Sequence, residues 1–317
     1  MDAKDFLLKE TQYCQEKYDE IERLLLAPEI TADAYEVKKL SKRKAFYGDI
    51  IKLRKEVCAI DEEINGYKTA LSNEADEEYS KLLSEEILSL KKKSDDACLK
   101  LTSSLEEPTL MKMTATTNDE RKKDLLNAYV SFARRLGYDV FPEEDGYVIF
   151  GGLKVMSVAN AVHRYIGEKG VRIQVVVFPY VRPEVKLDKK DVRVDIFLSH
   201  GKGGQNINKV ETAVRLTYLP KNIVVTCQDE RSQLENKKRA FEKLEEAVKR
   251  SSFDEAKAIN SKEYEKSLAL GGKRYFAIDI EKGSFTDDKG GKVSLKEFFD
   301  GDISALATQM IIGDLLR

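Results

Sequence analysis

Residues 192–233 are VRVDIFLSHGKGGQNINKVETAVRLTYLPKNIVVTCQDERSQ, the most informative stretch of the chain. Apolar and charged residues alternate at its start, with Val192, Val194 and Ile196 apolar, which predicts a strand with one buried face. A glycine-rich loop comes next. Two β-branched runs then flank Pro220-Lys221-Asn222, which is a hairpin signal. The stretch therefore predicts a small sheet with a loop between its first two strands.

The loop Ser199–Lys209 contains three glycines within four residues. Glycine reaches positive φ without a steric penalty and lets the backbone approach another molecule closely. Lys202 and Lys209 add positive charge beside the exposed backbone N–H groups, an arrangement that favours an anion or an oxyanion. A nucleotide P-loop is excluded, because none of the Gly-Lys pairs in the chain is followed by Ser or Thr.

The first hundred residues predict helices. Apolar residues recur at spacings of three and four from Ile50 to Leu71, a heptad pattern typical of a coiled coil. The polar run Asn73–Asp76 interrupts the pattern, and a second amphipathic run continues to Leu90. We expect an antiparallel helical hairpin, preceded by a helix at about residues 3–26, that serves as a structural or docking arm.

The rest of the chain mixes helices and strands. We expect a helix through Leu125–Leu136, a hairpin around residues 138–150, a second helix over Val155–Tyr165 and a strand over Val171–Val181. A long charged helix should run from about Ser232 to Arg250. The predicted fold class is α+β, a helical coiled-coil arm followed by α/β domains, one of which carries the glycine loop on a small mixed sheet with a long helix. The predicted domains are the arm at 1–105, an α+β domain at 106–189 that packs with 269–317, and the glycine-loop domain at 190–268.

Composition excludes several classes of protein. The 317 residues include two histidines and four widely separated cysteines, too few for a zinc cage or a disulfide framework. No apolar run is long enough for a transmembrane helix. The acidic first residues match neither a secretory signal nor a transit peptide, so the expected location is the cytoplasm. Residues 1–108 hold 18 Lys and Arg against 25 Asp and Glu, a balance of −7, which leaves +5 for the remainder of a chain whose net charge is −2.

The order of strand, Gly203-Gly204-Gln205 loop, hairpin and charged helix resembles the catalytic domain of class I peptide chain release factors. The resemblance extends over nearly the whole chain, since Ala161–Arg164 is similar to the family's Gly-Val-His-Arg segment and Phe285–Asp288 to part of its closing segment. It implies ribosome-dependent hydrolysis of the ester that joins the nascent peptide to tRNA. The implied partners are the rRNA of the peptidyl-transferase centre and peptidyl-tRNA, with no metal, no organic cofactor and no membrane.

The resemblance also implies roles for individual residues. Gly203 and Gly204 would form the tight turn, and Gln205 would stabilise negative charge through its backbone N–H while its side chain selects water. In the family this glutamine is commonly N-methylated, which implies a glutamine methyltransferase as a partner of Gln205. The cations expected to contact RNA are Lys202, Lys209, Arg215, Arg231, Lys237, Lys238 and Arg239.

The chain departs from the family where stop codons are read. The family uses a Pro-x-Thr or Ser-Pro-Phe tripeptide and a later histidine that stacks on a codon base. Tyr165–Gln174 contains neither tripeptide, and Gln174 stands about where the histidine would be. We therefore expect release with altered or absent stop-codon specificity, as in ribosome rescue. Two alternatives remain: a non-catalytic ribosome-binding protein that kept the fold, and a stop-codon reader that uses unfamiliar residues around Glu168-Lys169.

Overall fold

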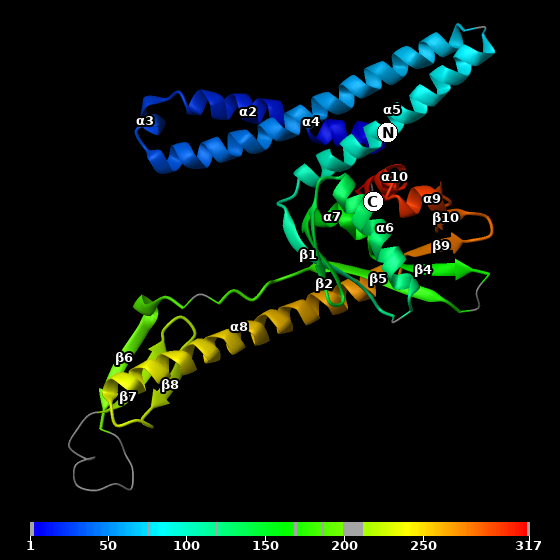
Figure 1. The fold of residues 1–317 in the computed structure, drawn as a ribbon. Coiled ribbons are helices and arrows are strands. Elements are labelled where there is room, and N and C mark those ends of the chain that lie inside the picture. The colour runs from blue at the N-terminus through cyan, green and yellow to red at the C-terminus, as the bar shows by residue number, and fades with distance from the viewer. Residues whose placement is uncertain are drawn as a thin grey trace. The chain divides into compact units, whose positions relative to one another are not determined.

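The computed structural model describes residues 3–74, 76–117, 119–167, 170–185, 187–198 and 212–315. The chain divides into two compact units, residues 1–180 with 263–317, and residues 181–262. Within the described residues, the larger unit contains a helical arm and an eight-stranded sheet, and the smaller unit contains a three-stranded sheet (Figure 1). The boundary between the units falls inside one long helix, α8 (Gln233–Gly271).

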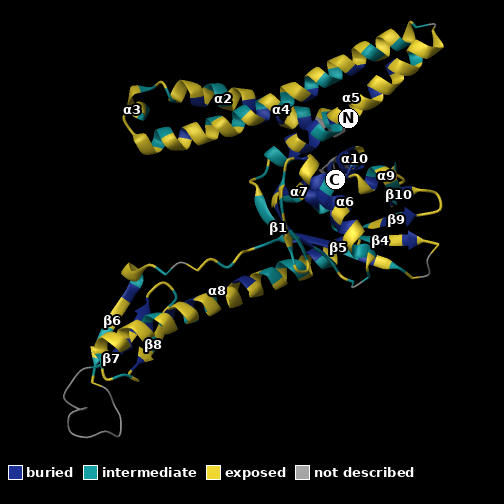
Figure 2. Cartoon of the chain, viewed as in Figure 1, coloured by how far each residue is buried: buried dark blue, intermediate teal, exposed yellow. Residues whose placement is uncertain are grey.

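The arm is a set of helices in which α4 and α5 run antiparallel, as predicted (Figure 1). The heptad residues Ile50, Val57 and Ile64 are buried, and exposed side chains cover the outer faces (Figure 2). Asp76 caps α5, because its Oδ1 accepts from Glu78 N at 2.8 Å. The helix expected at residues 3–26 is divided in two near Thr11. The arm helices are α1 (Ala3–Glu10), α2 (Tyr13–Leu24), α3 (Pro28–Thr31), α4 (Ala34–Ser72) and α5 (Glu77–Ser104).

The larger sheet has the strand order β11-β10-β9-β4-β5-β1-β3-β2. Its ladders are antiparallel except for the parallel pair of β4 and β9. The strands are β1 (Thr109–Ala115), β2 (Asp139–Glu143), β3 (Gly146–Gly151), β4 (Ala161–Ile166), β5 (Arg172–Pro179), β9 (Tyr275–Asp279), β10 (Ser284–Asp287) and β11 (Lys292–Ser294). The short helix α9 (Leu295–Phe299) and the closing helix α10 (Ser304–Leu315) follow β11.

Helix α6 (Arg121–Arg135) supplies much of this unit's core, as its apolar face predicted. Leu125, Tyr129 and Phe132 are almost fully buried in one cluster with side chains of the sheet. Gly137 follows the C-cap Leu136 and terminates the helix, with a φ of +84° that is accessible to glycine without penalty. The N–H of Gly137 bonds to Arg134 O at 3.0 Å, which satisfies one of the last carbonyls of the helix.

The prediction of a helix over Val155–Tyr165 is wrong. The segment forms a short helix α7 (Leu153–Met156), a 3₁₀ turn η1 (Ser157–Ala159) and then strand β4. β4 lies between β5 and β9, so its backbone groups bond on both sides, and Ala161, His163 and Tyr165 alternate into the core. Pairing with two neighbouring strands outweighs the local helical pattern.

The smaller unit packs three strands against α8. Strands β6 (Val192–Phe197), β7 (Ala213–Tyr218) and β8 (Ile223–Cys227) form an apolar core with Ala240, Leu244 and Val248 of the helix; a 3₁₀ turn, η2 (Lys189–Asp191), precedes β6. The sheet was expected to be mixed, but both ladders are antiparallel. Between β7 and β8 the reason is the connection, because the four residues 219–222 are too few for the crossover that a parallel pair needs.

Two further expectations for this region need correction. Helix α8 continues past Arg250 to Gly271, because residues 251–270 contain neither proline nor glycine. On the edge strand β6, Val194 and Ile196 are 36% and 45% exposed, so its alternating pattern buries Val192 but not the two apolar residues that follow.

The end of the arm is joined closely to the core of the larger unit. Leu99 of α5 is 1% exposed and belongs to that core cluster. Lys92 Nζ lies 2.8 Å from Glu297 Oε1 and 2.8 Å from Asp302 Oδ2. The hydrogen bond from Lys92 is the main cause that lowers the pKa of Glu297 to about 2. Packing and ion pairs therefore both attach α5 to the segment after β11.

We expect residues 106–317 to fold without residues 1–105, but with lower stability. Among the buried residues described in that core cluster, only Leu99 comes from the arm. Loss of a buried leucine costs about 2–5 kcal/mol, so urea should unfold the truncated protein at a lower concentration. Leu99→Ala in the full chain is the matched control, because it removes the same side chain and keeps the arm. A truncated protein without a cooperative transition would show that arm and core fold together.

Candidate active site

The glycine loop lies between β6 and β7, and the paired ends of these two strands form its base. Phe197 and Ala213 face each other as the last pair of the β6–β7 ladder. The predicted catalytic residues Gly203, Gly204 and Gln205, with Lys202 and Lys209, lie outside the described residues. Their roles therefore stay predictions, and the structure contributes the frame that holds the two ends of the loop.

Asn236 lies at the base of this loop and is fully buried. Its Nδ2 donates to Thr212 O at 2.9 Å and to Glu230 O at 2.8 Å. Its Oδ1 accepts from Glu230 N at 2.9 Å and lies 3.6 Å from the Cys227 thiol. Two carbonyls on one side and an N–H on the other fix the orientation of the amide. One side chain thus joins the loop end, the β8–α8 connection and the helix.

Sequence reasoning missed Asn236, although a signal was present. Asn236, Ala240, Leu244 and Val248 recur at intervals of four, which places the amide on the buried face of α8. An amide within an apolar stripe requires buried hydrogen-bond partners. Their identity was not predictable, because Thr212 and Glu230 approach Asn236 only in the folded sheet.

The cations predicted to contact RNA divide into two groups. Arg231, Lys237, Lys238 and Arg239 are exposed near the start of α8. Arg215 is also exposed, but it alternates with Val214 and Leu216, which pack in the core with α8, so Arg215 lies on the opposite face of the sheet.

Acidic residues of the β8–α8 connection already bind two cations of α8. Arg239 Nη2 lies 2.7 Å from Glu230 Oε1, and Lys243 Nζ lies 2.9 Å from Asp229 Oδ2. The hydrogen bond from Lys243 is the main cause that lowers the pKa of Asp229. Arg239 must therefore leave or share Glu230 to contact a phosphate.

The region expected to replace the codon-reading loop joins the antiparallel strands β4 and β5. Residues 167–171 connect β4 to β5, and Gly167 and Gly170 have φ values of +88° and +84°. Glu168 and Lys169 lie outside the described residues. Gln174 Nε2 donates to Leu268 O, in the last turn of α8, at 2.7 Å. The residue expected near the place of the family's stacking histidine therefore makes a structural hydrogen bond.

His163, in the segment that resembles Gly-Val-His-Arg, is a core residue. It is fully buried, its Nε2 lies 2.7 Å from Tyr129 Oη, and its Nδ1 lies 3.3 Å from Ile173 O. Its ring stacks on Phe285 with centroids 6.1 Å apart. Burial lowers the pKa of His163 to about 3. The imidazole is therefore neutral at physiological pH and packs the core.

This burial predicts acid sensitivity. Between pH 6.5 and about 3 the unfolded chain binds a proton at His163 that the folded chain does not, so stability falls as the pH falls. The slope approaches about 1.4 kcal/mol per pH unit for one group. His163→Gln removes this dependence. Urea unfolding of both proteins should show the stability gap between them narrowing by about 2 kcal/mol from pH 7.5 to pH 5. A gap independent of pH would contradict the assignment.

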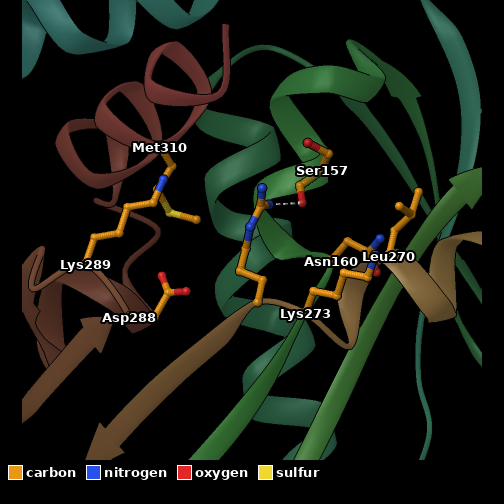
Figure 3. Close-up of a pocket in the computed structure, with 8 residues that line it drawn as sticks. Ser157, Asn160, Leu270, Lys273, Asp288, Lys289 and Met310 are labelled. Atoms are coloured by element: carbon orange, nitrogen blue, oxygen red, sulfur yellow. Dashed lines mark hydrogen bonds between the residues drawn. The ribbon is translucent and has the colours of Figure 1, made fainter. Parts of the chain in front are cut away.

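A hollow of about 370 Å³ in the larger unit is a separate feature (Figure 3). Arg274 is one of the residues that line it, and its Nη1 donates to Ser157 O at 2.9 Å. Ser157 Oγ, on the wall of the hollow, donates to Lys154 O at 2.7 Å. Other lining residues include Lys273, Lys289, Asp288, Leu270 and Met310.

Comparisons with known proteins identify the family. A model described as the RF-1 domain matches residues 181–275, and one described as the PCRF domain matches residues 14–159. Peptide chain release factor 1 of Syntrophomonas wolfei is 31% identical over 77% of this chain and 78% of its own length. The chain belongs to the class I peptide chain release factor family. The resemblance inferred from the glycine loop and its context is thereby confirmed.

Other release factors match nearly the whole chain. Peptide chain release factor 1 of a Geobacillus species is 28% identical and covers 95% of this chain and 94% of its own. That of Clostridium botulinum is also 28% identical, with 97% of each chain covered. The solved structure of RF2 of Thermus thermophilus covers 96% of this chain and 97% of its own at 23% identity, with a TM-score of 0.38. Among the described helices, none is long and apolar enough to cross a membrane.

Proposed function

We propose that this release factor frees nascent peptide with altered or absent stop-codon specificity, as a ribosome rescue factor does. Membership of the family implies the general activity, which is hydrolysis of peptidyl-tRNA on the ribosome. The proposal on specificity rests on one observation: the β4–β5 connection is a short glycine-bounded turn without either codon-reading tripeptide. The setting would be the cytoplasm.

The chemistry of base recognition supports this proposal. Reading a base requires side chains that reach its edge, whereas phosphate contacts position a protein without direct sequence information. Gln174 uses its amide nitrogen to bond Leu268 O. Arg121 holds its guanidinium 5.3 Å from the centre of the Tyr165 ring and pairs with Asp119 at 2.9 Å. The side chains of Gln174 and Arg121 are thus engaged within the protein, whereas Arg172, the first residue of β5, is exposed.

The glycine loop is proposed as the catalytic element. Gly203 and Gly204 would allow the turn, and the Gln205 N–H would stabilise the negative charge that develops on the reacting oxygen. Gln205 is also the proposed target of a glutamine methyltransferase. The cations proposed to meet rRNA phosphates are Lys202, Lys209, Arg215, Arg231, Lys237, Lys238 and Arg239. The proposed domains remain 1–105, 106–189 with 269–317, and 190–268.

The test is peptide release from purified ribosomes that carry labelled peptidyl-tRNA. We expect labelled peptide to be freed when the protein is added, and free peptidyl-tRNA without ribosomes to stay intact. A protein that binds these ribosomes and frees no peptide with any codon, or with none, in the A site would instead be the non-catalytic ribosome-binding alternative.

A further inference from the structure

We propose that the outer side of the N-terminal part of α4 is a binding surface for phosphates of ribosomal RNA, separate from the glycine loop. Four exposed lysines form this surface, which we call the α4 lysine face: Lys38, Lys42, Lys52 and Lys55. Binding there would depend on neither the chemistry of the glycine loop nor the reading of codons.

Charge is distributed unevenly within the arm. Residues 37–55 contain eight Lys and Arg and one acid, Asp49, a balance of +7. The other residues of 1–108 contain 10 Lys and Arg against 24 Asp and Glu, a balance of −14. Positive charge clustered along one helix is the electrostatic footprint of a nucleic-acid contact. A basic stretch inside an otherwise acidic arm therefore indicates a polyanionic partner.

The helix directs these lysines away from the packed side of the arm. Each member of the α4 lysine face stands two positions along the chain from a buried residue, which is Leu40, Ile50 or Val57. Because an α-helix turns by about 100° per residue, two positions place a side chain on the opposite side. The face consists of two pairs of lysines at helical spacings of three and four, at which like charges destabilise a helix. Such pairs favour an external counter-charge.

Other cations of α4 are already bound within the arm. Lys44 Nζ lies 2.7 Å from Glu22 Oε1, and Arg54 Nε donates to Leu8 O at 3.3 Å. The α4 lysine face differs, because its ammonium groups form no hydrogen bond or ion pair with any residue that the structure describes, Asp49 included. Their positive charges are therefore available to a ligand.

RNA suits the α4 lysine face better than a protein surface does. Lysine is depleted at protein–protein interfaces, whereas lysines on a regular helix can each meet a phosphate. The helix rises about 1.5 Å per residue, so Lys38 and Lys55 stand about 25 Å apart along its axis, a length that spans several phosphates of a duplex. The ribosome, on which this family acts, supplies such RNA. Phosphate contacts would position the protein without reading a sequence.

The triple variant Lys38→Ala, Lys42→Ala, Lys52→Ala tests the face through the salt dependence of binding to purified ribosomes between about 50 and 200 mM salt. Each lost phosphate contact should flatten the slope of log affinity against log salt by roughly 0.7–0.9, so the variant should lose about 2–3 of the slope. Its release rate at saturating protein should equal that of the parent. The Gly204→Ala protein should show the reverse, normal binding with slow release, so this surface and the catalytic loop can fail separately.

The matched control is the triple variant Lys81→Ala, Lys91→Ala, Lys93→Ala. It removes three exposed lysines from α5, the other long helix of the arm, where acids are numerous. Alanine is a strong helix former, so both triple variants should stay folded. The control should keep the salt slope of the parent. A slope that is unchanged in the α4 variant, or reduced equally in both variants, would overturn the inference.

A photoreactive side chain in place of Ser41 identifies the partner. Ser41 is exposed and adjacent to Lys42. Illumination of the complex with ribosomes should link it to rRNA, and links to ribosomal proteins alone would overturn the inference. Because the rest of the arm is acidic, a second copy of this chain is a competing occupant. Sedimentation at low salt should show a monomer, and a dimer that the α4 triple variant separates would also overturn the inference.

Discussion

Replacing Gly204 with Ala should lower the rate of peptide release on the ribosome by at least about 10²–10³-fold, the typical loss when one oxyanion donor is removed. The added Cβ would stand where the proposed turn needs none and would displace the neighbouring N–H of Gln205. Ribosome binding should change little, because the flanking cations and the rest of the chain are intact. The measurement is single-turnover release at saturating protein, with binding followed separately.

Gly66→Ala is the matched control for this substitution. Gly66 lies within α4, and a Cβ added there meets nothing within 4 Å. Alanine favours a helix over glycine by about 1 kcal/mol, so this variant should be at least as stable as the parent and should release peptide normally. Unaltered release by Gly204→Ala would remove the catalytic assignment of the loop, since the control establishes that the assay reports the site of the change.

Elements defined by their own sequence were predictable. The heptads of α4, the end of α6 at Gly137 and the turn at Pro220–Asn222 each follow from neighbouring residues, and the structure has all three. Segment 155–165 was not predictable in this way. Its apolar residues suit a helix and a buried strand alike, and the choice is made by β5 and β9, one of which lies more than a hundred residues away.

The candidate site also contains features that were predictable from the sequence and features that were not. The glycine loop is visible in the sequence because it stands between a predicted strand and a predicted hairpin, in the order that the family shows. The role of Asn236 is not visible in the sequence, because its hydrogen-bond partners, Thr212 and Glu230, come close to it only in the folded protein. The ion pair of Arg239 with Glu230 was also missed, since a run of cations at the start of a helix says nothing about which acid lies beside it.

The second large effect expected is the loss of codon preference. Release from ribosomes with a stop codon, a sense codon or an empty A site should proceed at similar rates. Each good bidentate contact to a base is worth about 1–3 kcal/mol of discrimination, or roughly 5–150-fold. The turn at residues 167–171 has no tripeptide of the known kind, and Gln174 is bonded to Leu268 O, so these contacts and most of the preference should be absent.

The double variant Glu168→Ala, Lys169→Ala tests the turn's part in a new reader, in which the exposed Arg172 would be the third residue. If codons are not read, the variant should show the same rates at all three kinds of A site, apart from a uniform loss from any phosphate contact of Lys169. Arg134→Gln is a suitable control, because Arg134 is an exposed cation at the end of α6, away from the turn. A parent protein that strongly prefers stop codons would contradict codon-independent release. If the double variant then lost that preference while Arg134→Gln kept it, the turn between β4 and β5 would be the reader, and its specificity would come from side chains at two positions in place of a tripeptide.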